Sequence, residues 1–175
     1  RSRVLCAPTN DELAGKSLGL IGLGASGREL AKRAWAMGMR TMAIDIADVP
    51  QATRDELHIA FFGDPSQLDK VLVEADYLSI HTPLTSRTRH MIDRRVLELM
   101  KPTAVLINVA RGGIVDADAL FEALQIGQLR GAGLDAFDQE PIDPTHPLLQ
   151  MENVIITPHV AGVTAEIALR RGQAL

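Results

Sequence analysis

The stretch Gly22-Leu23-Gly24-Ala25-Ser26-Gly27 follows a short apolar run, Leu18–Gly22, and precedes a segment whose apolar and small residues recur with helical spacing. A G-x-G-x-x-G element in this context is typical of a turn that binds the pyrophosphate of a dinucleotide. We expect Gly22 to allow the tight turn, Gly24 to let the backbone approach the phosphates, and Gly27 to permit close packing of the helix. The free N–H groups at the helix start would bind the anion. The motif alone does not exclude a glycine turn that only eases packing.

An acidic residue, Asp45, ends the next predicted strand, Thr41–Asp45. A carboxylate there can accept hydrogen bonds from the ribose hydroxyls of an adenosine and would repel a 2′-phosphate, which favours NAD over NADP. The alternative interpretation is a solvated turn aspartate. The place of Asp45 after a strand and the glycine motif favours the cofactor role. Arg40 precedes the strand and is expected at its opposite end.

Short apolar runs alternate with helical patterns along the chain. The predicted strands are Leu18–Gly22, Thr41–Asp45, Tyr77–His81, Ala104–Val109, Gly131–Ala136 and Val154–Thr157, with a weaker candidate at Ile59–Phe62. The predicted helices cover Gly27–Gly38, Leu68–Ala75, Asp93–Met100, Asp118–Ile126 and Thr164–Ala174. Continuously apolar strands are typical of a parallel sheet covered on both faces. The pattern therefore predicts an α/β fold with a doubly wound, Rossmann-like parallel sheet.

Local signals set some of the predicted boundaries. Asp64, Pro65 and Gln67 form a capping box before the second helix, and Gly127 is placed to end the fourth. The longest irregular stretch, Phe137–Asn153, is of the length that often carries function in a compact domain. The stretch Gln51–Gly63 carries no diagnostic motif.

The composition excludes several classes of protein. Of 175 residues, 46% are apolar and 23% charged, which is typical of a globular domain rather than a disordered chain. The net charge of −4 gives no support to a nucleic-acid surface, and no apolar run approaches a membrane span. The single cysteine, Cys6, excludes an internal disulfide and a four-cysteine metal site. We expect a cytoplasmic protein that binds no nucleic acid, membrane or metal.

The chain begins with Arg1, and we expect it to be a piece of a longer protein. We interpret residues 1–16 as a lead-in segment and residues 17–175 as one dinucleotide-binding domain.

Four further motifs each begin at or just after the end of a predicted strand, where open α/β sheets bind their ligands. They are His81-Thr82-Pro83-Leu84-Thr85, Asn108-Val109-Ala110-Arg111-Gly112-Gly113-Ile114-Val115-Asp116, Gly133-Leu134-Asp135-Ala136-Phe137 with Glu140-Pro141, and Thr157-Pro158-His159-Val160-Ala161-Gly162.

In this order and spacing, the series closely resembles the NAD-binding domain of the D-isomer-specific 2-hydroxyacid dehydrogenases, a family that includes phosphoglycerate dehydrogenase. The resemblance runs from about Glu12 to Gly162. It implies NAD as cofactor, a small 2-hydroxy or 2-oxo acid as substrate, and a homodimer. It also implies a second, substrate-binding domain, which is absent from this chain. The active site of the family lies between the two domains.

By this resemblance, Arg111 binds the substrate, and Glu140 and His159 form the acid/base pair. A planar guanidinium binds a carboxylate through two hydrogen bonds, and histidine exchanges a proton near neutral pH. A carboxylate on the other ring nitrogen fixes the tautomer and favours the imidazolium. In isolation, Arg111 could be a surface arginine, Glu140 a solvated loop residue and His159 a structural histidine.

The resemblance also assigns contacts with the cofactor. Ala25 and Ser26 would meet the pyrophosphate, and Asp135 would hold the nicotinamide carboxamide with Gly162 beside it. The complete set of expected cofactor contacts is Gly22, Gly24, Ala25, Ser26, Gly27, Asp45, Thr82, Pro83, Val109, Ala110, Arg111, Asp135, His159 and Gly162. His81 is expected near the cofactor but outside the chemistry, whereas His58, His90 and His146 show no motif.

Together, these expectations predict that the protein is an NAD-dependent oxidoreductase, which interconverts D-2-hydroxy acids and 2-oxo acids by hydride transfer. Formate dehydrogenases share the fold but pair a glutamine with the histidine, so Glu140 argues against that activity. Phosphite oxidation stays open. An NAD-sensing protein similar to the C-terminal-binding-protein corepressors is the alternative of a different class, and a structural domain without a ligand is the third.

Overall fold

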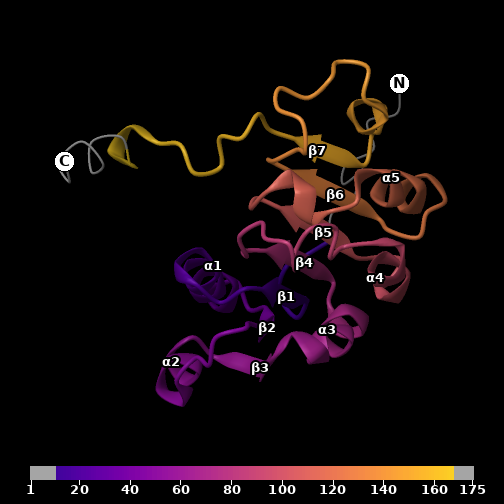
Figure 1. Ribbon diagram of the computed structural model, residues 1–175. Coiled ribbons are helices and arrows are strands. Elements are labelled where there is room, and N and C mark those ends of the chain that lie inside the picture. Colours follow the sequence, from indigo (N-terminus) through magenta and orange to yellow (C-terminus); the bar gives the residue numbers. More distant parts are fainter. Residues whose placement is uncertain (1–10, 168–175) are drawn as a thin grey trace, which may run out of the picture.

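The computed structural model describes residues 11–167, and one parallel sheet organises them (Figure 1). Its seven strands lie in the order β3-β2-β1-β4-β5-β6-β7, and every neighbouring pair is parallel. The strands are β1 (Ser17–Ile21), β2 (Arg40–Ile44), β3 (Ile59–Gly63), β4 (Tyr77–Ile80), β5 (Val105–Asn108), β6 (Gly131–Leu134) and β7 (Val154–Ile156). This order reverses between β1 and β4, as in a doubly wound dinucleotide-binding fold. The predicted fold class is confirmed.

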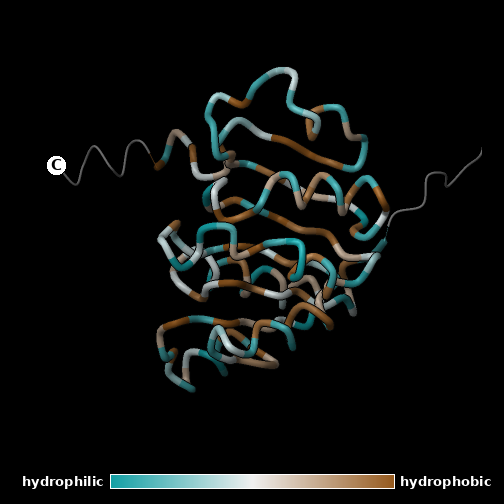
Figure 2. The backbone as a smooth tube through the Cα atoms, turned by 45° about the vertical axis from the view of Figure 1, so that its right-hand side comes forward, coloured by the Kyte–Doolittle hydropathy of each residue, from teal (hydrophilic) through white to brown (hydrophobic). Residues whose placement is uncertain are grey.

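Helices lie on both faces of the sheet (Figure 1). They are α1 (Ala25–Ala36), α2 (Gln51–Glu56), α3 (Leu68–Glu74), α4 (Arg94–Leu99) and α5 (Ala117–Gln125). Residues of α1 pack with Leu20, Ala43 and Leu57 in one apolar cluster, and α3, α4 and α5 form a larger cluster on the opposite face. In Figure 2, brown apolar stretches run through the middle of the molecule, whereas teal hydrophilic stretches lie toward its surface, in loops and on helices.

Several predicted helix boundaries follow from side-chain caps. The Asp64–Gln67 capping box is formed, although it opens a short 3-10 turn, Pro65–Gln67, that leads into α3. Asp93 caps α4, and Asp116 accepts hydrogen bonds from two amides at the start of α5. These side chains satisfy N–H groups that a helix start leaves without partners.

One helix was not predicted and one expectation needs correction. Helix α2 lies in the stretch Gln51–Gly63, where no helix was predicted. None of its six residues is buried, so no apolar stripe marks it in the sequence. The expectation of strands covered on both faces holds for β1, β2 and β4 but not for β5 and β7. Ile155 of β7 is 75% exposed, and Ile107 of β5 is half-buried, because no described helix covers that face beyond β4.

The last predicted helix, Thr164–Ala174, lies mostly outside the described residues, as do Cys6 and most of the lead-in segment. The division of the chain at residue 16 therefore stays a prediction. Between residues 11 and 167, no helix is long and apolar enough to cross a bilayer.

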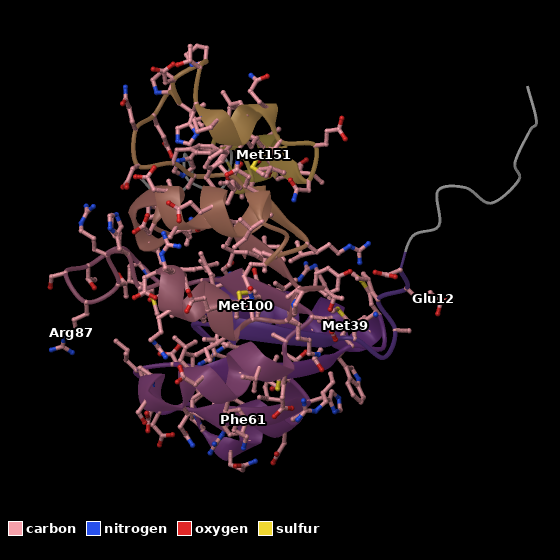
Figure 3. All side chains as sticks on the ribbon, turned by 90° about the vertical axis from the view of Figure 1, so that its right-hand side faces the viewer. Glu12, Met39, Phe61, Arg87, Met100 and Met151 are labelled. Atoms are coloured by element: carbon pink, nitrogen blue, oxygen red, sulfur yellow. The ribbon has the colours of Figure 1, made fainter. Side chains whose placement is uncertain are left out.

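The interior is closely packed around aliphatic and methionine side chains. Figure 3 shows Met39 and Met100 within the body of the protein, and they are only 6% and 2% exposed. In the same view Arg87 projects outward from the loop between β4 and α4. This loop begins at the carboxyl end of β4, so it lies at the edge where a ligand is expected.

Replacement of Gly27 by alanine tests the packing of the glycine turn. A Cβ atom at Gly27 would collide with the carbonyl oxygen of Gly22, a backbone atom that cannot rotate away. We expect Gly27→Ala to lower the free energy of unfolding by about 1–3 kcal/mol, measured by urea denaturation. In the control, Gly133→Ala, the nearest atom to the new Cβ is 4.0 Å away, so its stability should match or exceed wild type. A wild-type midpoint for Gly27→Ala would contradict this packing.

Candidate functional site

The glycine motif forms a tight turn between β1 and α1. Gly22 has a φ of +100°, which favours glycine, and a Cβ atom there would lie 2.7 Å from the carbonyl oxygen of His81. The first backbone hydrogen bond of α1 runs from the Arg28 amide to the Gly24 carbonyl. The amides that precede this bond are those that a helix start leaves free. The turn therefore presents N–H donors and the positive end of a helix dipole.

The space around the turn suits a phosphate group. A Cβ atom added at Gly24 would meet no atom within 4 Å, so the backbone is open to a ligand there, and Ala25 and Ser26 are exposed. No described side chain caps the start of α1. An anion that approaches Gly24 can thus bind the backbone amides directly. These features fit the pyrophosphate of the predicted dinucleotide.

Asp45 lies directly after β2 and faces the turn. One of its carboxylate oxygens accepts the Leu23 amide at 2.6 Å, and the other accepts the Ala47 amide at 2.9 Å. The side chain thus joins the end of β2 to the glycine turn, and each oxygen retains a lone pair for a further donor. Arg40 begins β2, at the opposite end of the strand, where it pairs with Glu74.

A cleft of about 520 Å³ lies where the strand order reverses. Ser26 lines it from the glycine turn, together with residues that follow β4 and β5. Several expected cofactor contacts therefore share one cleft, namely Ser26, Thr82, Pro83, Val109, Ala110 and Arg111. A crevice at this place in an open α/β sheet is the usual site for a nucleotide. The assignment of individual contacts stays a prediction.

The two residues of the predicted acid/base pair lie in contact, and their catalytic role stays a prediction. His159 Nδ1 lies 2.7 Å from Glu140 Oε2, and the other oxygen of Glu140 accepts the Phe137 amide at 2.9 Å. Glu140 comes from the loop after β6 and His159 from the segment after β7. With Nδ1 bound to the carboxylate, the Nε2 atom of His159 has no hydrogen-bond partner among residues 11–167.

The electrostatics keep Glu140 ionised. The hydrogen bond from the Phe137 amide, followed by the contact with His159, lowers the pKa of Glu140 below its usual value. The positive charge of Arg111 acts in the same direction. Arg111 therefore lies near enough for its charge to act on the Glu140 carboxylate, and its role toward a substrate stays a prediction.

Close backbone packing brings the Arg111 loop against the Glu140 loop. A Cβ atom at Gly112 would overlap the backbone of Phe137 and Asp138, so only glycine fits there. The Arg111 guanidinium is exposed and donates to the Ala110 carbonyl at 2.7 Å. Its remaining N–H donors can bind a carboxylate.

Asp135 is buried, with 3% exposure, at the end of β6. Its carboxylate accepts hydrogen bonds from the Thr157 hydroxyl and from the amides of Val160 and Ala161. Burial by itself raises the pKa of Asp135, but these hydrogen bonds outweigh it and the pKa is lowered. The contact of Asp135 with a nicotinamide carboxamide stays a prediction. The structure shows a further role for Asp135, which is to hold the segment that carries His159.

Gly162 follows this segment, is exposed, and has no atom within 4 Å of an added Cβ. Its predicted place beside the nicotinamide stays a prediction.

Two supporting residues were not recognised from the sequence. Asn108, 1% exposed, donates to the Arg111 carbonyl at 2.9 Å and accepts the Ala110 amide at 3.1 Å, so it shapes the Arg111 loop. Thr157 binds Asp135. Both residues lie inside quoted motifs, and a polar residue at the end of a buried strand was the signal that could have identified Asn108.

Comparison with known proteins agrees with this geometry. Residues 5–161 match the family model described as D-isomer specific 2-hydroxyacid dehydrogenase, NAD binding domain. The chain is 41% identical to a glyoxylate reductase of Korarchaeum cryptofilum over 93% of this chain and 47% of that protein. It is 42% identical to a hydroxypyruvate reductase of Thermotoga maritima over 92% of this chain and 51% of that protein.

A solved structure is also similar. The D-lactate dehydrogenase of Lactobacillus jensenii, solved with NAD+, superposes with a TM-score of 0.78 at 36% identity, covering 92% of this chain and 52% of that chain. The chain thus spans about half the length of the curated relatives it matches.

The Asp135 carboxylate predicts a pH-dependent stability. Because its pKa is lower in the folded than in the unfolded state, the ionised group stabilises the fold at neutral pH, and this contribution is lost as the pH falls through the folded pKa. We expect Asp135→Asn to lower the free energy of unfolding by about 1–3 kcal/mol at neutral pH. The difference from wild type should shrink below about pH 4.

Urea denaturation across this pH range is the measurement. Asp48→Asn, which changes an exposed aspartate, is the matched control and should leave stability unaltered. A deficit of Asp135→Asn that is the same at all pH values would contradict the ionised, hydrogen-bonded state of Asp135.

Proposed function

The chain belongs to the D-isomer-specific 2-hydroxyacid dehydrogenase family and forms its NAD-binding domain, and from this we propose that the whole protein interconverts D-2-hydroxy acids and 2-oxo acids by hydride transfer with NAD(H). The observation that carries the proposal is the His159–Glu140 pair at 2.7 Å, with the charge of Arg111 acting on the same carboxylate.

The residues of the pair have complementary tasks in this reaction. NAD(H), when bound, supplies or accepts the hydride. In the direction of reduction, His159 as imidazolium donates a proton from Nε2 to the oxygen that becomes the hydroxyl. The ionised Glu140 accepts a hydrogen bond from Nδ1–H, which orients the ring and stabilises its positive charge. In the direction of oxidation the same ring takes up the hydroxyl proton.

Arg111 is proposed to bind the substrate. A 2-oxo acid carries a carboxylate beside a carbonyl group, and a guanidinium can donate to both because its N–H groups form a planar fork. Arg111 is exposed at the cleft that Ser26 and Val109 also line. The substrate carboxylate would therefore lie at the edge of the cofactor cleft.

The names of the relatives favour small 2-oxo acids as substrates. The relatives described above are named glyoxylate reductase and hydroxypyruvate reductase, and we propose this substrate class for the protein. The corepressor alternative gains no support from these comparisons. A homodimer and a cytoplasmic location remain expectations from the sequence.

A substrate panel tests the proposed function. The full-length protein is incubated with NADH and with glyoxylate, hydroxypyruvate or pyruvate, and NADH consumption is followed. We expect turnover of at least one of these acids, and a much weaker catalytic efficiency for Arg111→Lys, because an ammonium group cannot reproduce the fork. NADH binding without turnover of any 2-oxo acid would overturn the enzymatic proposal and favour an NAD sensor.

Substitution of His159 tests the acid/base role. His159 has a φ of +56°, a conformation that asparagine tolerates well, so His159→Asn removes the imidazole without backbone strain. We expect kcat to fall by about 10²–10⁴-fold with little change in NADH affinity. The control is His58→Asn, which changes an exposed histidine of φ +52° that stacks on Trp35 outside the site. Wild-type turnover by His159→Asn would exclude the assigned role.

Substitution of Asp45 tests the choice of cofactor. Asp45→Ala removes the negative charge that would oppose a 2′-phosphate, so the preference for NADH over NADPH should fall by about tenfold or more. The catalytic efficiency with NADH should also fall, because the Leu23 amide loses its acceptor. Asp48→Ala, in the same loop, is the matched control. An unchanged ratio of efficiencies with the two cofactors would exclude the ribose contact.

A further inference from the structure

Three side chains form a hydrogen-bonded chain from the interior of the sheet to the glycine turn. The Ser79 hydroxyl oxygen lies 2.9 Å from His81 Nε2, and His81 Nδ1 lies 2.9 Å from the Ser26 hydroxyl oxygen. Ser79 belongs to β4, His81 follows that strand, and Ser26 lies in the first turn of α1. These three side chains form no part of the His159–Glu140 pair.

Burial decides the direction of the first hydrogen bond. Ser79 is 2% exposed, and across residues 11–167 the His81 ring is the one hydrogen-bond partner of its hydroxyl. If Nε2 donated to Ser79, the hydroxyl proton would have no acceptor in a site shielded from water, which is costly. The Ser79 hydroxyl therefore donates to Nε2.

The direction of the second hydrogen bond follows from the first. A neutral imidazole carries one proton, so a ring that accepts at Nε2 must donate from Nδ1. Burial lowers the pKa of His81, which keeps the ring neutral at neutral pH. Nδ1–H then donates to the Ser26 oxygen. The hydroxyl proton of Ser26 is therefore free to form a hydrogen bond with a group other than the ring.

Ser26 is exposed at the edge of the cofactor cleft, beside the open backbone at Gly24. A hydroxyl that already accepts from the ring can donate outward to a phosphate oxygen. In the opposite tautomer, Nδ1 would accept a hydrogen bond from the Ser26 hydroxyl, and only the lone pairs of the Ser26 oxygen would face the negatively charged phosphate. The tautomer of His81 thus decides whether Ser26 attracts or repels the pyrophosphate.

We propose that Ser79 and His81 are positioning residues for the dinucleotide: they hold the ring as the Nδ1–H tautomer and thereby keep the Ser26 hydroxyl as a donor toward the pyrophosphate. The identity of the ligand rests on the proposed function, whereas the tautomer does not. Ser79 lies inside the sheet and influences the cofactor only through His81 and Ser26.

The tautomer is measured directly by nitrogen NMR of the wild-type protein with isotope-labelled histidine and without NADH. The His81 signals are assigned by their loss in His81→Asn. We expect a proton on Nδ1 and none on Nε2 at neutral pH. A ring protonated on Nε2, alone or together with Nδ1, would overturn the proposal.

A double-mutant cycle measures the effect on the cofactor. NADH dissociation constants are compared for wild type, Ser79→Ala, Ser26→Ala and the double variant. Ser79→Ala should weaken binding by about three- to tenfold, the effect of one lost hydrogen bond, although it deletes no atom that contacts the cofactor. In the Ser26→Ala background the same substitution should have no further effect, because its influence passes through Ser26. Wild-type affinity of Ser79→Ala, or additive losses, would overturn the relay.

Thr41→Val is the matched control. Thr41 is also a strand residue, 1% exposed, and its hydroxyl has no partner among the described residues. This substitution should leave NADH affinity at the wild-type value, and an equal loss would attribute the Ser79 effect to the sheet rather than to the relay. Failure of the wild-type protein to bind NADH would overturn the proposed function, whereas an Nε2–H ring would overturn the relay alone.

Discussion

The parallel direction of all seven strands is the constraint on which the site depends. Because every strand points the same way, the segments that follow β1, β4, β5 and β6 all begin at one edge of the sheet. The glycine turn, the His81 segment, the Arg111 loop and the Glu140 loop are those segments. The strand order reverses between β1 and β4, so the glycine turn after β1 and the His81 segment after β4 lead away from each other. The cleft that would bind the cofactor lies between them.

Buried polar side chains at the strand ends fix these segments in place. Asn108 shapes the Arg111 loop, and Asp135 holds the segment that carries His159. Ser79 orients His81 toward the glycine turn. Each of these groups is buried and therefore requires hydrogen-bond partners, and the partners belong to the loops. Buried polar side chains of the sheet thus position the exposed side chains of the site, because they form hydrogen bonds with the loops that carry them.

Much of the fold was predictable from local patterns. Strand and helix boundaries agree within one or two residues where apolar periodicity and caps coincide, as at β1 and around Asp64. Helix α2 was missed because a short, solvent-exposed helix carries no apolar stripe. The exposed face of β5 and β7 was not anticipated either, since continuous apolarity in a strand does not reveal whether a helix covers it.

The sequence by itself determined the fold class, the glycine turn and the set of reactive residue types, because periodicity and motif spacing are properties of the chain. The contact of Glu140 with His159 was expected from the family resemblance alone, and the tertiary structure supplied its geometry. Only the tertiary structure decided that Gly112 lies against the Phe137 backbone, and that Asp135 and Ser79 act on loops. These contacts join residues from different strand ends. Their distances depend on strand order and packing, which no local pattern encodes.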